Sequence, residues 1–386
     1  MNTSDPAALL EKLLTCPSVT PDEAGALRVL EDFLTPLGFS CTRLTFDGDG
    51  SYPVENLFAT RGAGTPHLLY AGHVDVVPAG PEEEWSAPPF GARLIDGNMI
   101  GRGAVDMKGG IAAWCSAVEA LVRSDRTGSG TISLAITCDE EADAINGTEK
   151  LLEWAGENGH AFDLAIVGEP ASAGAVGDRV RVGRRGSYNG RIVIRGQQGH
   201  VAYPGDTINP IPVAAAIATK LTAEKLDDGT PHFEPSNLQI TAIHAGGKTT
   251  NLVPGEAELL FNIRHNDHWT PDLLTTWLRD RIAAVDAGRS RIELFPPTRT
   301  ARCFLSAGNT RVDDLVEAVT SKTGSAPQLS TGGGTSDARF IARYCPVVEL
   351  GLIGTTMHQI DERVSLTDLK ELTGLYETII TQFMAR

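Results

Sequence analysis

Three apolar segments, each ending in acidic or histidine residues, alternate along the chain with segments of helical spacing, and this pattern restricts the fold more than any other feature. Residues 68–72 lead into His73-Val74-Asp75, residues 131–138 into Asp139-Glu140-Glu141, and residues 164–167 into Gly168-Glu169-Pro170. Strands that alternate with helices form an open α/β sheet, and such sheets bind ligands beyond the carboxyl ends of their strands. The sequence therefore predicts an α/β domain with a polar site along one sheet edge.

The order of strand-like and helical segments changes between residues 180 and 296, so a second domain is expected there. Segments 187–195, 237–245 and 257–266 are strand-like, whereas 209–221 and 270–285 have helical spacing. This order is typical of a small α+β domain with an antiparallel sheet and two helices on one face. We expect residues 180–296 to be inserted into a discontinuous α/β domain of residues 1–179 and 297–386, which carries a mixed, largely parallel sheet flanked by helices. Within that domain, helices are predicted from Ser4 and Pro6 to residue 14, and over residues 20–37.

Composition excludes several classes of partner. The chain has 386 residues and a formal charge of −16, which disfavours binding to nucleic acid or to an anionic membrane. No apolar run approaches the roughly 20 residues that cross a bilayer, and residues 1–5 do not begin a signal peptide. The six cysteines are scattered without a C-x-x-C pair, so we expect free, mostly buried thiols and a cytoplasmic protein.

One segment departs from the acidic character of the chain. Residues 179–195 carry six arginines, and no acid lies between Asp178 and Asp206. A local anionic ligand would explain this basic segment. The alternative is that these arginines lie on the solvent face of a pair of strands.

The candidate site residues are imidazoles and carboxylates without a thiolate. They are His73, Asp106, Glu140, Glu141, Glu169 and His358. This set suits Zn, Mn or Co in a hydrolytic site, and two ions a few ångströms apart would explain the number of candidate ligands. Asp106 is placed at the start of a helix, where its carboxylate can point back over the sheet.

Two pairs within this set suggest a division of roles. His73 and Asp75 lie two positions apart on a strand, so their side chains can meet, and Asp75 can orient the imidazole; the alternative is an ordinary strand-end hydrogen bond. Glu140 and Glu141 face opposite ways if the segment is extended. One can then bind metal while the other takes a proton from water and passes it to a leaving nitrogen. The alternative for this pair is two exposed surface acids.

These motifs, in this order over nearly the whole chain, resemble the di-zinc aminoacylase and carboxypeptidase family. The resemblance rests on the motifs at residues 72–75, 103–110, 139–141, 168–170, 199–200 and 357–358. It implies two Zn²⁺ ions, which Co²⁺ can replace, and a cis peptide bond at Asp106-Met107. It also implies that His73 and Glu169 hold one ion, that Glu141 and His358 hold the other, and that Asp106 bridges them. Asp75 would support His73, and Glu140 would be the general base.

The resemblance extends to the inserted domain, which it implies is a dimerisation and lid domain. His200 resembles a residue that reaches across a homodimer to stabilise an oxyanion; the alternative is a turn histidine packed beside Tyr203. Further motifs resemble the members that remove a succinyl group from an anionic acylated diamino acid. The substrate-binding residues implied are Arg184, Arg185, Ser187, Asn251, Arg264, Gly334, Thr335 and Ser336. Arg181 departs from the lysine expected in such members, and Ala338 departs from a glycine.

Two alternatives to this function are left open. One is an enzyme on the same scaffold with another acyl substrate, such as acetylornithine deacetylase or a related aminoacylase or peptidase. The other is a catalytically silent binding module. The paired arginines disfavour a substrate with a small neutral acyl group, and the full ligand set together with Glu140 disfavours the silent module.

Overall fold

The computed structural model describes residues 5–386 and divides the chain into two compact units. The first, called here the metal unit, comprises Met1–Gly183, Ser306–Ser330 and Ser336–Arg386. The second, called the inserted unit, comprises Arg184–Leu305 and Thr331–Thr335. The inserted unit thus begins four residues after the expected residue 180 and ends nine residues after the expected residue 296. The short loop Thr331–Thr335 also belongs to it.

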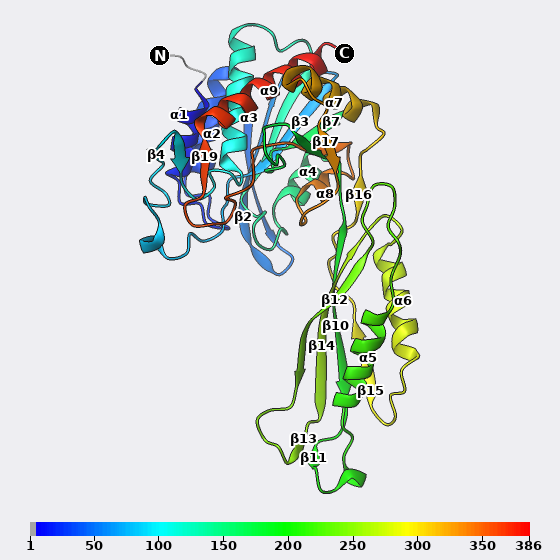
Figure 1. Ribbon diagram of the computed structural model, residues 1–386. Coiled ribbons are helices and arrows are strands. Elements are labelled where there is room, and N and C mark those ends of the chain that lie inside the picture. Colours follow the sequence, from blue (N-terminus) through cyan, green and yellow to red (C-terminus); the bar gives the residue numbers. More distant parts are fainter. Residues whose placement is uncertain (1–4) are drawn as a thin grey trace. The chain divides into compact units, whose positions relative to one another are not determined.

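The metal unit is built on a mixed sheet of eight strands (Figure 1). Its central strands β6, β3, β7 and β18 run parallel, whereas β1, β2 and β6 pair antiparallel. Every residue of β3, β6 and β7 is buried, as expected for strands covered on both faces. In sheet order the strands are β1 (Ser40–Gly48), β2 (Ser51–Arg61), β6 (Thr131–Thr137), β3 (His67–His73), β7 (Leu164–Val167), β18 (Val347–Glu349), β8 (Arg179–Arg181) and β17 (Gln328–Ser330).

Helices cover this sheet, and α3 is buried over most of its length. It packs beside α1 and α9 (Figure 1). The rings of Tyr70, Trp114 and Tyr376, one each from β3, α3 and α9, contact one another and join α3 and α9 to the sheet. The helices of this unit are α1 (Pro6–Leu14), α2 (Ala26–Leu34), η1 (Thr35–Leu37), η2 (Glu82–Glu84), α3 (Lys108–Arg123), α4 (Thr148–Glu157), α7 (Thr310–Thr323), α8 (Ala338–Ile341) and α9 (Leu366–Met384). A small sheet pairs β19 (Arg363–Ser365), β5 (Asn98–Ile100) and β4 (Arg93–Ile95).

Two helix starts differ from the sequence prediction. The helix expected from residue 20 begins at Ala26, because residues 20–21 and 24–25 form turns. Helix α1 begins at Pro6 as expected, but Asp5 caps it by accepting a hydrogen bond from the Ala7 amide. The expected cap, Ser4, lies outside the described residues.

The inserted unit is an antiparallel sheet with two helices, as the sequence predicts. The sheet order is β12 (Asn237–Ala245), β14 (Glu256–His265), β10 (Gly186–Arg195) and β15 (Arg291–Phe295). Apolar residues of β10 and β14 form one buried core with α5 (Ile211–Ala223) and α6 (Pro271–Ala283). Short elements complete the unit: β11 (Gly199–His200) pairs with β13 (Leu252–Val253), β9 (Gly183–Arg184) pairs with β16 (Phe304–Leu305), and η3 covers Pro204–Asp206.

Two expectations from composition can be compared with the structure. All six cysteines are free; Cys16, Cys115, Cys138 and Cys345 are buried, whereas Cys41 and Cys303 are partly exposed. Among the described residues, no helix combines the length and the apolar character that a membrane crossing requires.

Candidate metal centre

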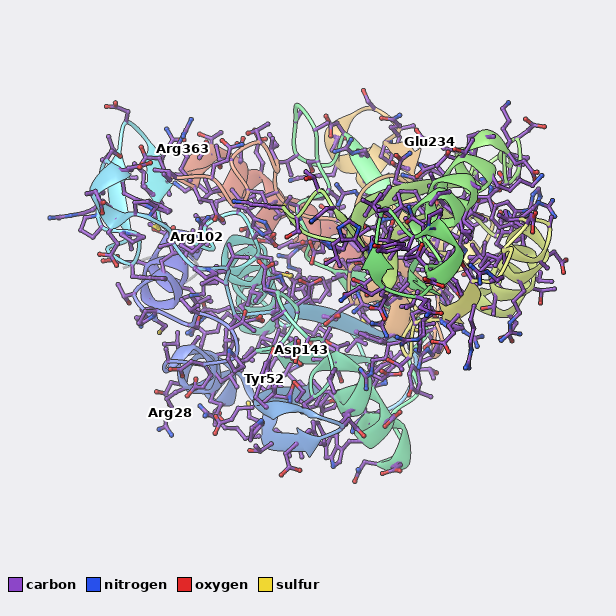
Figure 2. The ribbon with its side chains drawn as sticks, turned by 90° about the horizontal axis from the view of Figure 1, so that it is seen from below. Arg28, Tyr52, Arg102, Asp143, Glu234 and Arg363 are labelled. Atoms are coloured by element: carbon purple, nitrogen blue, oxygen red, sulfur yellow. The ribbon has the colours of Figure 1, made fainter. Side chains whose placement is uncertain are left out.

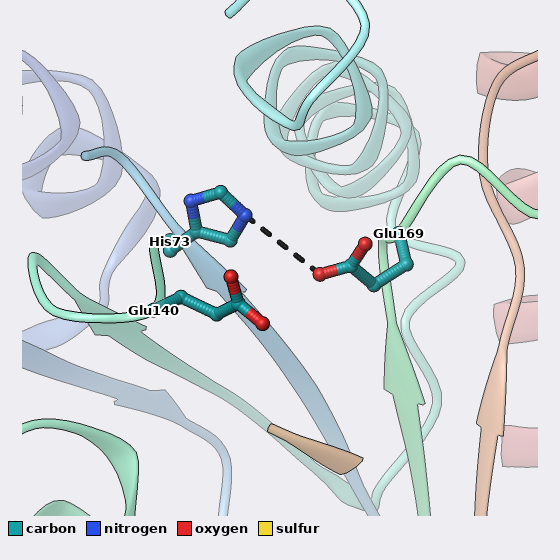
Figure 3. Close-up of side chains that lie close together, drawn as sticks. All are labelled: His73, Glu140 and Glu169. Atoms are coloured by element: carbon teal, nitrogen blue, oxygen red, sulfur yellow. Dashed lines mark ion pairs between the residues drawn. The ribbon is translucent and has the colours of Figure 1, made fainter. Parts of the chain in front are cut away.

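The carboxyl ends of three neighbouring parallel strands bring the predicted residues together. His73 is the last residue of β3, Glu140 follows the end of β6, and Glu169 follows the end of β7. Figure 3 shows the three side chains converging, with a dashed line between His73 and Glu169. Parallel pairing of β6, β3 and β7 explains this, because it aligns their carboxyl ends at one edge.

Asp106 lies between the two histidines and presents one oxygen to each. Its Oδ1 is 3.3 Å from His73 Nε2, and its Oδ2 is 3.1 Å from His358 Nε2. Asp106 precedes α3, and the Asp106-Met107 bond is cis, as the resemblance implies. A carboxylate held between two imidazoles in this way has the geometry of a bridging ligand.

Each histidine also meets one glutamate. His73 Nε2 lies 3.7 Å from Glu169 Oε1, and His358 Nε2 lies 3.0 Å from Glu141 Oε1. His358 has a φ of 62°, in the left-handed region that non-glycine residues rarely adopt. Asp106 therefore contacts one histidine of each pair, although Glu141 also forms a group with His73 and Asp106.

The fully buried Asp75 contacts His73 differently from the simple strand-end pair that we predicted. The closest partner of His73 Nδ1 is the backbone oxygen of Asp75, at 2.9 Å, and the Asp75 carboxylate is 3.5 Å away. That carboxylate accepts hydrogen bonds from the amides of Glu140 and Glu141 and from the Thr20 hydroxyl, the last at 2.7 Å. Asp75 thus orients the imidazole through its main chain and positions the two glutamates through its side chain.

The segment that carries the two glutamates is also fixed from β2. The Tyr52 hydroxyl donates to Asp139 Oδ1 at 2.7 Å and accepts from the Asp143 amide, and Figure 2 shows Tyr52 beside Asp143. The other oxygen of Asp139 accepts from the amides of Ile145 and Asn146. Asp139 is fully buried and so acts as an internal cap for the loop.

The electrostatics of the cluster show an excess of negative charge. Burial disfavours the imidazolium of His73, but the nearby carboxylates of Asp106 and Asp75 raise its pKa well above the usual value. Hydrogen bonds to Asp106 and Glu141 raise the pKa of His358 to about 10. Burial, followed by the charge of Glu169, raises the pKa of Glu140 well above its ordinary range. Four carboxylates around two imidazoles therefore create a site that favours cations.

The residues present fit divalent metal ions. Two groups of side chains, His73 with Glu140 and Glu169, and His73 with Asp106 and Glu141, have ligand atoms within 4.8 Å of one another. His73 Nε2 and Asp106 Oδ1 are buried and lack hydrogen-bond partners, although such atoms normally have one. Oxygen and imidazole ligands without sulfur match Zn, Mn or Co. The carboxylate of Glu140, predicted as the base, thus lies close enough to His73 and Glu169 to contact the same ion.

In the inserted unit, four of the predicted substrate residues lie at one end of the sheet. Ser187 pairs in register with Arg264, and Arg184 and Arg185 directly precede β10. Arg264 Nη1 is buried without a hydrogen-bond partner, and the charge of Arg185 contributes to lowering the pKa of Arg264, after burial. Arg185 contacts Glu234 at 3.4 Å. These arginines form a cationic patch suited to carboxylates.

His200 and Asn251 lie at the opposite end of this sheet. Strand β10 pairs with β14 from Gly186 to Arg195, which corresponds to about 30 Å. Strand β11, which carries His200, lies with β13 beyond that far end (Figure 1). There the Val201 amide donates to the Asn251 oxygen. Its Nδ1 accepts from the Ala202 amide, and its ring lies 5.8 Å from that of Tyr203. Within one chain, His200 and Arg264 therefore cannot contact the same small molecule.

The glycine-rich loop at residues 331–336 is divided between the two units, because Thr331–Thr335 belong to the inserted unit and Ser336 to the metal unit. The Gly334 oxygen accepts from Arg184 at 2.8 Å, and Thr335 is exposed. Ser336 belongs to the metal unit, where its buried hydroxyl donates to Glu349, a residue that Arg181 also contacts. The Ser336 hydroxyl is thus already engaged inside the metal unit.

Two of the six arginines in residues 179–195 lie on the solvent face of the sheet, as the alternative to an anionic ligand supposes. Arg191 contacts Glu258, and Arg195 contacts Glu256 and Glu293, all on neighbouring strands. These two arginines form solvent-side ion pairs, whereas Arg184, Arg185 and Arg264 remain the candidates for an anionic ligand.

Sequence reasoning missed the residues that hold the centre in place. Thr20 contacts Asp75, the Lys108 ammonium donates to the Cys16 oxygen from a fully buried position, and Arg102 pairs with Glu362. The one available signal was proximity in sequence, since Lys108 lies in the same motif as Asp106, Arg102 directly precedes that motif, and Glu362 closely follows His358.

Comparison with known proteins agrees with this geometry. The sequence model of peptidase family M20/M25/M40 matches residues 69–382. A protein of Rhodopseudomonas palustris (strain BisB5) named succinyl-diaminopimelate desuccinylase is 47% identical over 385 residues, which is 99% of each chain.

Solved structures with the same fold span nearly the whole chain. The aminopeptidase PepT of Bacillus cereus has a TM-score of 0.76 at 22% identity, covering 99% of this chain and 98% of its own. A Bacillus subtilis protein described as a dinuclear metal-binding peptidase of the M20 family has a TM-score of 0.70 at 16% identity, covering 98% and 97%. From the family match and the 47% identical relative, we conclude that the chain belongs to peptidase family M20/M25/M40.

Proposed function

We propose that this chain hydrolyses the amide bond of N-succinyl-LL-2,6-diaminopimelate, releasing succinate and LL-2,6-diaminopimelate, with two zinc ions that cobalt can replace. The hydrolytic part rests above all on Asp106, which offers one oxygen to each of two imidazoles. The choice of substrate rests on the name of the 47% identical relative. The number of metal ions is supported by the dinuclear description of the Bacillus subtilis protein.

The distances around Asp106 support the proposed ligand roles. His73 and Glu169 would hold one ion, Glu141 and His358 the other, and Asp106 would bridge them. When bound, such ions polarise a carbonyl and make water more acidic.

Glu140 is proposed as the group that moves the proton. Its carboxylate lies beside the ligands, and burial raises its pKa, so it readily accepts a proton. It would take this proton from the attacking water and deliver it to the departing amide nitrogen. Its amide is fixed on the Asp75 carboxylate, which keeps the side chain at this position.

Recognition of the substrate is assigned to the inserted unit. The substrate has three carboxylates and one ammonium group, and guanidinium groups bind carboxylates through two parallel hydrogen bonds. Arg184, Arg185 and Arg264 would supply them, with neutral donors from Ser187, Gly334 and Thr335. Ser336 is proposed to act indirectly, since it holds Glu349.

A homodimer is part of the proposal because of the position of His200. His200 and Asn251 lie about 30 Å from the arginine patch of their own unit, so we assign them to the site of a second copy. Exposed apolar side chains near them, Val201, Tyr203, Ile243 and Leu252, support a contact surface on this part of the unit. The inserted unit is thus proposed as the dimerisation and lid domain.

Metal analysis together with a substrate comparison tests the proposal. We expect two equivalents of divalent metal per chain, loss of activity on chelation, and a kcat/KM for succinyl-diaminopimelate far above that for acetylornithine. Preference for the acetyl substrate would instead assign the chain to the deacetylases on this scaffold. Two bound ions without hydrolysis of any acyl-amino acid would support a silent binding module.

A further inference from the structure

A buried ion pair lies directly behind the metal centre. Arg102 Nη1 is 2.8 Å from Glu362 Oε2, and the two residues are 3% and 0% exposed. Figure 2 labels Arg102, whose guanidinium carbon lies 5.2 Å from the centre of the Trp85 ring. Burying two charges costs more than their attraction returns unless further hydrogen bonds satisfy them. The partners of this pair therefore indicate what it does.

Glu362 holds the backbone from which the Asp106 side chain projects. Its Oε1 accepts from the amide of Val105 at 2.9 Å and from that of Asp106 at 3.1 Å. The Glu362 main-chain oxygen also accepts from the Gly101 amide. The carboxylate thus fixes the position of Asp106 without touching its ligand oxygens.

Arg102 holds the backbone of the other histidine ligand. It donates to the oxygen of Gln359 at 3.1 Å and to that of His358 at 3.5 Å. It also reaches the oxygens of Pro78 and Ala79, beyond β3. His358 has the left-handed backbone noted above, a conformation that persists only where its surroundings enforce it.

His73 and Glu169, the proposed ligands of the other cation, are held in place by the main sheet instead. His73 ends β3 and Glu169 follows β7, so the ladder of the main sheet sets their separation. His358 and Asp106 both lie in loops, and the pair Arg102–Glu362 contacts the main chain of each.

We propose that Arg102 and Glu362 are positioning residues that set the distance between Asp106 and His358, and thereby the affinity of the cation position formed by Asp106, Glu141 and His358. The inference rests on the proposed two-metal function. It concerns metal binding rather than chemistry, because neither side chain reaches a ligand atom.

Metal titration of the Glu362→Gln variant tests the proposal. A glutamine oxygen can face the two amides or Arg102, but not both, so one of the loops is released. Starting from metal-free protein, we expect the first Zn²⁺ to bind with an affinity within about threefold of the parent. We expect the second to bind about 10- to 100-fold more weakly, the range typical when a partner of a metal ligand is removed. The spectrum of Co²⁺ at the second site should change as well.

Two further variants separate positioning from a general loss of stability. Glu119→Gln is the control, because Glu119 is also buried in the metal unit and paired with an arginine, Arg123, but lies near the C-terminal end of α3. For this variant we expect parental binding of both ions. Arg102→Lys keeps the charge but loses most of the contacts to backbone oxygens, and should weaken the second site less than Glu362→Gln does. Urea unfolding of each metal-free protein identifies conditions in which all are folded.

The outcomes distinguish this inference from the proposed function. A parent that binds fewer than two ions contradicts the two-metal function itself. If the parent and folded Glu362→Gln both bind two ions with affinities within twofold, only the positioning role is refuted. Equal weakening of both ions would also refute it, since the pair would then support the whole centre rather than one position.

Discussion

At the scale of single residues, several acidic residues of the candidate metal centre each join two segments of the chain. Asp106 divides its oxygens between two imidazoles. Asp75 uses its main chain for His73 and its side chain for the amides of Glu140 and Glu141. Asp139 ties Tyr52 to the following loop. Because each of these residues contacts two segments, we expect a substitution at any of them to loosen more than one segment.

Glu140 offers the sharpest test at this scale. In Glu140→Gln the side chain keeps its volume but cannot accept a proton, so we expect kcat to fall by about 10²- to 10⁴-fold. Metal content should remain at the parental value, because the ligand set is intact. Steady-state kinetics and metal analysis of the same preparation check this. Activity within a few-fold of the parent would remove Glu140 from the role of base, and loss of one ion would make it a ligand.

At the scale of elements, periodicity predicted the strands and helices well, because local spacing encodes which face is buried. Strands β3, β6 and β7 and helices α5 and α6 begin and end within about two residues of their predicted positions. The predicted start of α2 was wrong, since the turn at residue 20 is held by a tertiary contact to Asp75, which the apolar pattern does not encode. Chain order along the sheet edge also indicated which ligands would converge. Arg102 and Glu362 could not be found in this way, because 260 residues separate them and only tertiary packing brings them together.

The first residue of β3 gives a prediction about pH. Burial lowers the pKa of His67 to about 4, and its Nε2 lies 2.8 Å from the Ser133 hydroxyl. The unfolded chain, with a pKa near 6.5, binds a proton that the folded chain does not, so acidification between pH 6.5 and 4 destabilises the fold. In His67→Gln, we expect a smaller drop in urea midpoint between pH 7.5 and pH 5. Replacing the exposed His244 by glutamine is the control, and it should leave the parental drop unchanged.

At the scale of the whole molecule, the proposed site needs parts of two chains. Mixing Glu140→Gln with His200→Ala protein, each of low activity alone, tests this. A mixed dimer would contain one site with both wild-type groups, so random exchange of subunits should restore about a quarter of parental activity. Size-exclusion chromatography verifies that each variant is dimeric. If mixing restores nothing although subunits exchange, His200 acts within its own chain. Parental activity of His200→Ala alone would remove His200 from catalysis.

The junction between the units has a consequence of its own. The Ser306 amide donates to the Val182 oxygen at 2.7 Å, so the chain leaves the metal unit and returns to it at adjacent points. Replacing residues 184–305 by a short glycine bridge should therefore yield a smaller protein that still captures two cations but no longer distinguishes one acylated amino acid from another. Such a truncated protein, assayed by zinc titration and by hydrolysis of small amides, would show how much of the chemistry the cation-binding half performs alone.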